Sequence, residues 1–260
     1  MEEADRVLAL PAPGLLLQAT RADGIVRLHN HGSHHVRPHQ AESAAEDDPH
    51  YGRQAYSTRT GPTATGNVAD NHLSVVVGGR PSVRRRVHPL GAGHGDGWGW
   101  AASWHRPVFA GGPPMVPGLR VESVTVARGR HELRVHRVVG APDGSLVTHT
   151  GWATGPDEPL VSSLHGLHGW DEPVAGLIRA PQGTAFTRWA RVPRLGGRSH
   201  GTSVHVALAS LTTEPGPGSP AEAVREVRVD GGRTVEVVWA GSGARTRIAF
   251  DPVEVGHTVR

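Results

Sequence analysis

The chain has 260 residues, of which 37% are hydrophobic and 20% charged, and its formal net charge at pH 7 is +3. This balance, together with seven Trp residues, excludes an intrinsically disordered chain. All 27 basic residues are Arg, and most of them alternate with apolar residues, so the basic stripe of a nucleic-acid-binding protein is missing. The absence of Cys excludes disulfides and thiolate metal sites.

The N-terminal residues predict neither a secretion signal nor a membrane span. Met1–Asp5 is acidic, and Pro11 and Pro13 interrupt the apolar stretch Val7–Leu17. We therefore expect a cytoplasmic protein without a membrane partner, in which residues 1–12 form a linker-like start.

Short segments in which apolar and polar residues alternate predict β-strands along the whole chain. The weaker ones are Gly24–His29, Gln54–Thr58, His72–Val77, Ser82–His88, Trp98–Trp104 and His200–Thr212. The stronger ones form a middle group, Ser123–Ala127, His131–Val139 and Ser145–Trp152, and a last group, Ala223–Val229, Thr234–Trp239 and Thr246–Phe250. No segment predicts an α-helix of three turns.

Turn residues separate the strands of both groups. Arg128-Gly129 and Ala141–Gly144 predict reversals in the middle group, and Asp230–Gly232 and Gly241–Gly243 predict them in the last. We therefore predict an all-β fold with one domain over residues 1–260. It is an antiparallel, supersandwich-like β-sandwich of about fifteen strands in two packed sheets.

The densest histidine cluster lies between His29 and His35. His29 and His31 are two residues apart, so on a strand they share one face, where two imidazoles with a carboxylate can bind a divalent metal. Gly32 follows at once, and a loop of solvated histidines is the alternative. The chain also lacks a phosphate loop and a dinucleotide fingerprint, so we expect no cofactor.

The segment Trp98–Pro107 carries aromatic residues at strand spacing. Trp98, Trp100 and Trp104 fall on one face of a regular strand, where a row of indoles can stack against a sugar ring or belong to the core. His105 and Arg106 end this segment and either contact a carboxylate or hydroxyl group or cap the sheet.

Two more segments carry residues for proton transfer. Tyr56 lies in Tyr51–Gly61, and His72 closes Asp70-Asn71-His72. Tyr, His and Arg that converge in space can serve proton abstraction or hydrolysis. The Gly-spaced segment Leu164–Asp171 either closes over a site or forms an ordinary turn.

Several of these segments together resemble the C-terminal part of a bacterial family, the domain-of-unknown-function-2264 family. The resemblance runs from about Pro11 to about Phe250. The segments that carry it are Tyr56–Gly61, Asp70–His72, Gly97-Trp98 with Ala101–Pro107, Val121–Thr125 and Glu132–Arg137.

The resemblance implies a two-domain architecture. Such proteins have a large N-terminal α/α toroid followed by a β-sandwich, similar to heparinase-type polysaccharide lyases, and part of the family is associated with hydrolysis of uronic-acid-containing glycans. The helical domain is missing here, as in a split gene product, a fragment or a decayed enzyme. The chain then corresponds to the C-terminal accessory domain, not catalytic alone, with a helical toroid domain or separate chain as partner and a carbohydrate as ligand. The sheet residues that would contribute to the cleft are Tyr56, His72, Trp104, His105 and Arg106.

Two alternatives stay open. A free-standing carbohydrate-binding module predicts a solvent-facing row of Trp residues. A His-dependent metal enzyme predicts metal bound at His29 and His31. Fold analogy alone does not decide among these functions.

Overall fold

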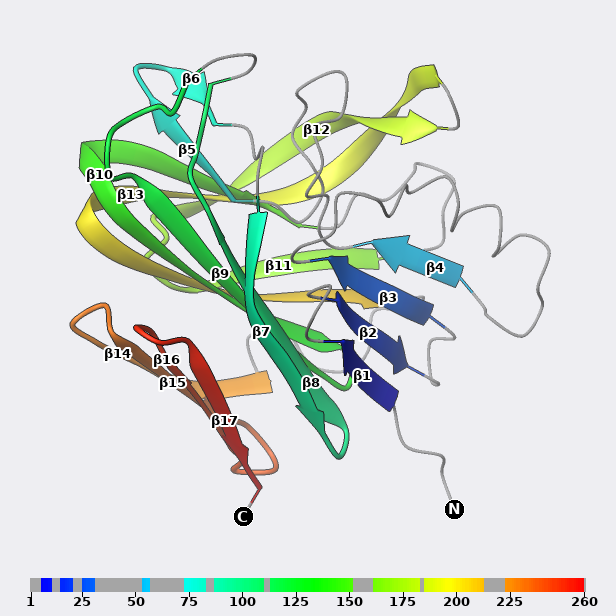
Figure 1. Ribbon diagram of the computed structural model, residues 1–260. Coiled ribbons are helices and arrows are strands. Elements are labelled where there is room, and N and C mark those ends of the chain that lie inside the picture. Colours follow the sequence, from blue (N-terminus) through cyan, green and yellow to red (C-terminus); the bar gives the residue numbers. More distant parts are fainter. Residues whose placement is uncertain are drawn as a thin grey trace.

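The computed structural model describes residues 6–10, 15–20, 25–30, 53–56, 73–82, 87–109, 113–151, 161–182, 185–212 and 223–259. These residues form strands, turns and bends and contain no α-helix, which confirms the all-β class (Figure 1). The expected count of about fifteen strands is wrong, because strands β1 to β17 occupy these residues. The part of the chain that the structure describes therefore contains no helix long and apolar enough to span a membrane.

The strands form three sheets instead of the two that were expected. The N-terminal sheet has the order β1 (Arg6–Leu10), β2 (Leu15–Thr20), β3 (Ile25–Asn30) and β4 (Arg53–Tyr56). The C-terminal sheet has the order β14 (Val224–Asp230), β15 (Thr234–Trp239), β16 (Arg245–Ala249) and β17 (Glu254–Thr258). All pairings in these two sheets are antiparallel except the parallel pair β3–β4.

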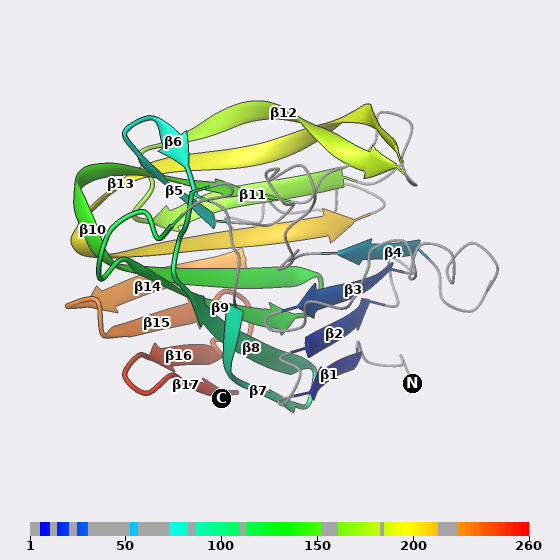
Figure 2. The same cartoon turned by 45° about the horizontal axis from the view of Figure 1, so that its top comes forward.

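The central sheet has nine strands, and its main path has the order β11-β13-β10-β9-β8-β7. Figure 2 shows β11, β13 and β10 side by side, while β12 pairs with β13, and β5 pairs with both β10 and β6. Its strands are β5 (Leu73–Val77), β6 (Arg80–Pro81), β7 (Val87–Gly95), β8 (Trp98–His105), β9 (Arg120–Arg128), β10 (His131–Thr150), β11 (Val161–His168), β12 (Glu172–Gln182) and β13 (Ala185–Thr212).

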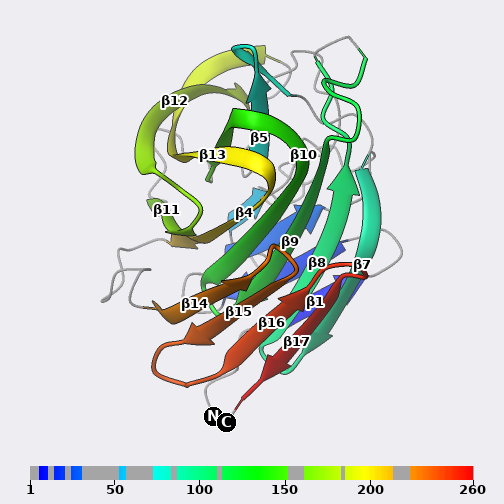
Figure 3. The same cartoon turned by 90° about the vertical axis from the view of Figure 1, so that its left-hand side faces the viewer.

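The central sheet is buried on both faces, because the two smaller sheets pack on opposite sides of it (Figures 1 and 3). On the outer face, defined as the face toward the C-terminal sheet, Val124, Val135 and Val206 meet Val237 and Ile248 in one core. Burial of each such aliphatic side chain stabilises the fold by about 1.5–3 kcal/mol.

The inner face is the opposite face of the central sheet. There, Ala9 and Leu16 of the N-terminal sheet pack on Ala101 and Ala127 of β8 and β9. All four side chains are buried. The first strand, Arg6–Leu10, thus lies inside the segment that was expected to be linker-like.

The predicted reversal at Ala141–Gly144 does not occur. Strand β10 continues from His131 to Thr150, with irregular register at this point, and pairs with β13 on both sides of it. Gly140 and Gly144 adopt positive φ values of 72° and 74°, which bend the strand without reversing it. Ser145 donates a hydrogen bond of 2.6 Å to the carbonyl of Pro142 across the bend. As a result β10 and β13 curl together (Figure 3).

Candidate functional site on the two faces of the central sheet

Strand β8 places the residues predicted from the sequence on different faces. Its indoles point to the outer face, as strand alternation requires, but they do not share one environment. Trp98 and Trp100 are half-buried and pack against the core between the central and C-terminal sheets, with the Trp98 ring 4.9 Å from that of His257. Trp104 lies outside that core and stacks on His88.

The two polar residues at the end of β8 also have different surroundings. His105 is on the inner face and only 1% exposed, whereas Arg106 is exposed. Only Arg106 is therefore open to solvent as a contact for a ligand.

Of the other predicted site residues, the structure describes either the backbone alone or nothing. Tyr56 ends β4 and His29 lies in β3, but their side chains are outside the described part, as are His31 and His72 entirely. Convergence of Tyr56 and His72 with His105, and a metal site at His29 and His31, thus stay predictions. Among the residues that the structure does describe, no three potential His or carboxylate ligands gather in a metal-binding group.

The inner face carries a polar row that was not predicted from the sequence. In register across β8, β9, β10 and β13, Ser103 pairs with Ser123, Ser123 with His136, and His136 with His205. His136 Nδ1 lies 2.9 Å from Ser123 Oγ, and all four residues are buried. The one available signal is the alternation in β10, which puts Glu132, Arg134 and His136 on one face of a strand that neighbouring strands enclose.

A buried ion pair continues this polar row. Arg134 Nη2 donates to Glu132 Oε2 at 2.6 Å, with both side chains at most 2% exposed. Arg134 Nη1 also lies 3.2 Å from His149 Nε2. Because a guanidinium group only donates, Nε2 accepts, and the proton of the neutral His149 ring sits on Nδ1.

His205 is fixed at the other end of the row. Its Nδ1 donates to the carbonyl of Gly169 at 2.7 Å, so Nε2 accepts from Ser203 Oγ at 2.9 Å. Ser199 Oγ lies 2.7 Å from Ser203 Oγ and extends the chain of hydrogen bonds. Burial lowers the pKa of His205 to about 4, so the imidazole is neutral near pH 7.

The segment Leu164–Asp171, expected to be a loop, is mostly strand, because Leu164–His168 belongs to β11, and the turn Gly169–Asp171 that follows packs on the inner face. The ring of Trp170 lies 4.9 Å from that of His205 and 6.1 Å from that of His149, and its Nε1 donates to the carbonyl of Val206 at 2.9 Å. Gly169 has a φ of 77°, and a Cβ there would lie 2.4 Å from the carbonyl oxygen of Val204. This position therefore requires glycine.

These contacts define an interior network. The hydrogen-bond partners of His149 and His205 fix the tautomers of these two rings, and Arg134 is paired with Glu132 inside the protein. Within the network, His136 links β10 to Ser123 of β9, the Arg134–His149 contact joins two distant parts of β10, and His205 binds the turn at Gly169. On the outer face, by contrast, the half-buried Trp104 stacks on the exposed His88.

Comparison with known proteins identifies the fold. No family model matches the chain, so membership of the domain-of-unknown-function-2264 family is not confirmed, and no curated protein matches it. Heparinase III is similar with a TM-score of 0.52 and 10% identity over 100% of this chain and 43% of that chain. A heparan sulfate lyase from Pedobacter heparinus has a TM-score of 0.44 and 10% identity over 72% of this chain and 30% of that one. The chain thus spans less than half the length of these solved proteins, and its whole length has the fold of a part of heparinase III.

Proposed function

We propose that this chain is the β-sandwich part of a carbohydrate-active protein, with the architecture of a heparinase-type polysaccharide lyase, and that it is not catalytic alone. The observation that carries the proposal is the extent of the likeness, since the whole chain matches less than half of heparinase III. A helical toroid domain, on the same or a separate chain, is the partner that would complete the cleft. The expected cytoplasmic, bacterial setting belongs to the same proposal.

The burial of the inner network supports an accessory role. The inner-face histidines His105, His136, His149 and His205 are each at most 5% exposed. An enzyme that worked alone would need such groups within hydrogen-bonding reach of a substrate.

The proposal is tested by activity on acidic glycans. The chain alone, and the chain mixed with a helical toroid domain encoded beside it, are incubated with heparan sulfate, heparin and alginate. A lyase product is detected by the ultraviolet absorbance of its unsaturated uronic acid, and hydrolysis is followed with aryl uronides. Cleavage only in the mixture is expected, and turnover by the folded chain alone would contradict the proposal.

A free-standing carbohydrate-binding module is the second candidate. The half-buried Trp104 on the outer face favours it, because this indole packs outside the core that takes Trp98 and Trp100. Glycan binding by the chain, with no cleavage in the chain or the mixture, is the result that this candidate predicts.

A further inference from the structure

A second row of side chains crosses the outer face at the edge of the central sheet. In register, His88 of β7 pairs with Trp104 of β8, Trp104 with Glu122 of β9, and Glu122 with Arg137 of β10. Strands lie about 4.8 Å apart, so this row is a closely spaced set of aromatic and charged groups. The edge strand β7 leaves its outermost member, His88, exposed.

His88 and Trp104 form a stacked pair. Their ring centroids are 4.4 Å apart and their planes differ by 17°. Arg120, also on β9, places its guanidinium carbon 5.8 Å from the centre of the Trp104 ring, so this charge and the indole are neighbours. The three side chains come from three adjacent strands, and Trp104 is on the middle one.

Arg120 keeps most of its hydrogen-bonding capacity. Its side chain is 37% exposed. Only Nη2 contacts the protein among the described residues, where it bonds to Glu122 Oε1 and lies 3.5 Å from Asp251 Oδ1. The two N–H groups of Nη1 and the Nε–H group remain as donors. They point in different directions, so each can donate a single hydrogen bond to an oxygen of a carboxylate or sulfate group.

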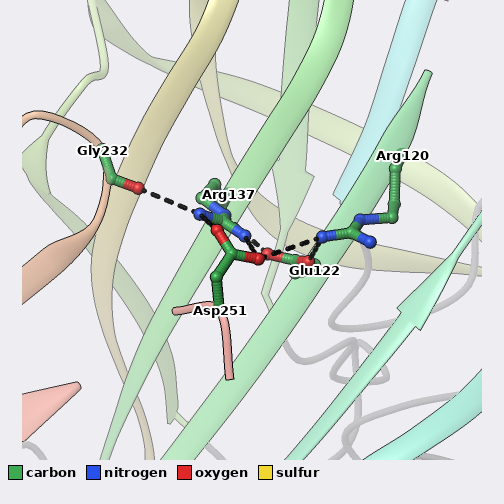
Figure 4. A network of polar contacts seen from close by, with 5 residues as sticks. All are labelled: Arg120, Glu122, Arg137, Gly232 and Asp251. Atoms are coloured by element: carbon green, nitrogen blue, oxygen red, sulfur yellow. Dashed lines mark hydrogen bonds and ion pairs between the residues drawn. The ribbon is translucent and has the colours of Figure 1, made fainter. Parts of the chain in front are cut away.

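A buried network holds Arg120 in this position (Figure 4). Glu122 is buried and accepts a 2.6 Å hydrogen bond from Arg137 Nε. The two terminal nitrogens of Arg137 bind Asp251 at 2.6 and 2.7 Å, which ties the β16–β17 turn to the central sheet. The carboxylate that orients Arg120 is thus itself fixed from the other side.

The local charge favours an anion. Hydrogen bonds from Arg137 lower the pKa of Asp251, and the charges of Arg137, Arg120 and Arg233 act in the same direction. Arg120 and Arg137 thus pair with the carboxylates of Glu122 and Asp251, and Arg233 adds a further positive charge that acts on Asp251.

We propose that His88, Trp104 and Arg120 form a surface binding site for an anionic saccharide, in which Arg120 binds the carboxylate or sulfate group and the stacked rings contact the sugar. Aromatic rings offer an apolar surface to the C–H groups of a pyranose. The exposed His88 ring adds hydrogen-bonding capacity beside it. The carbohydrate nature of the ligand rests on the proposed function, while the need for an anion rests on Arg120.

Binding of defined oligosaccharides to the full chain tests the site. The probes are a sulfated heparan oligosaccharide, its chemically desulfated counterpart that keeps the carboxylates, and a neutral cello-oligosaccharide of similar length, each followed by isothermal titration calorimetry. We expect the acidic probes to bind and the neutral probe to bind at least tenfold more weakly. Binding of both acidic probes identifies the carboxylate as sufficient, and binding of the sulfated one alone identifies the sulfate.

Matched variants assign the binding to this site. Arg120→Gln should weaken binding about tenfold, and Arg120→Lys, which keeps the charge but loses the planar fork, should weaken it several-fold. Arg247→Gln removes one positive charge from an exposed position of β16 and should leave binding unchanged. His88→Ala, at an exposed position, should weaken binding without altering the fold.

The outcomes separate this site from the proposed function. Equal losses in Arg120→Gln and Arg247→Gln would show a non-specific charge effect and overturn the site. Absence of binding to any acidic probe would overturn it too, even if the chain mixed with its helical partner still cleaves glycans. If the mixture cleaves no glycan but binding still depends on Arg120, the proposed enzyme role is overturned and the binding site is supported.

Discussion

Arg134 Nη1 and His149 Nε2 lie 3.2 Å apart although the two residues are 15 positions apart on a single strand. A fully extended segment of that length would span roughly 50 Å. The contact therefore exists only because β10 bends at Gly140 and Gly144 and curls with β13. The inner network thus depends on the curl of β10, and its contacts in turn stabilise that curl.

Replacement of Glu132 by Gln should strongly destabilise the fold. The change removes the carboxylate charge that faces Arg134 Nη2 at 2.6 Å in a fully buried position. Loss of one member of a buried ion pair costs about 3–5 kcal/mol. Urea denaturation gives the free energy of unfolding, and Glu254→Gln on the exposed edge of β17 should change it by less than about 0.5 kcal/mol. A similar small change in both variants would contradict the assignment of this pair to the interior.

Acid should destabilise the protein through His205. Its pKa falls from 6.5 to about 4 on folding, mainly because it is buried, so the unfolded chain binds more protons between these values. Stability from this group is complete above pH 6.5 and is lost as the pH falls toward 4, by on the order of 3 kcal/mol. The measurement is the free energy of unfolding at pH 7, 5.5 and 4.

Two histidine variants isolate this effect. His205→Gln should flatten the pH dependence of the unfolding free energy across this interval, whereas His200→Gln, at an exposed position, should leave its slope unchanged. An unchanged slope in His205→Gln would assign the acid sensitivity to other groups.

Replacement of Gly169 by Ala should displace the turn Gly169–Asp171 from the inner face. Both the φ of 77° and the 2.4 Å approach to the Val204 carbonyl oppose a Cβ there. Gly201 has a φ of 59° but no atom near its Cβ position, so Gly201→Ala measures the cost of backbone conformation alone, about 1–2 kcal/mol. Gly169→Ala should cost clearly more, and equal costs in thermal unfolding would argue against close packing of Gly169 on β13.

Replacement of Arg137 by Met should weaken the attachment of the C-terminal sheet. Arg137 bonds Glu122 and Asp251 and lies 4.7 Å from the centre of the Phe250 ring, so its loss leaves the buried Glu122 with Arg120 as its remaining partner. We expect a loss of about 3 kcal/mol and faster amide hydrogen exchange in residues 245–258. Asp251→Asn, at a side chain that is 61% exposed, should have a much smaller effect.

Local signals predicted the strands more reliably than their arrangement. In the C-terminal sheet, Asp230–Gly232 supplies the turn and Val235, Val237 and Trp239 the alternation, so sequence and structure agree there. At Ala141–Gly144 the same turn chemistry produced a bend, because β13 pairs with β10 on both sides of it. A turn signal alone does not distinguish these outcomes.

The site residues show the same limit. Alternation placed Trp98, Trp100 and Trp104 on one face correctly, but only the C-terminal sheet, far along the chain, separates the first two from Trp104. The pairing of His136 with His205 depends on the register of two long strands, which no local pattern contains. The roles predicted for Tyr56 and His72 stay predictions.

The length of β13 has a consequence for how the chain folds. This single strand, residues 185–212, pairs with β10, β11 and β12. The central sheet therefore cannot be completed until β13 has left the ribosome. Until then β10 presents an open edge of unpaired peptide groups, the kind of edge that pairs with other chains. Sequence-distant pairing of this sort also slows folding. Production of the protein should therefore depend on temperature and chaperones during synthesis, even where the finished fold is stable.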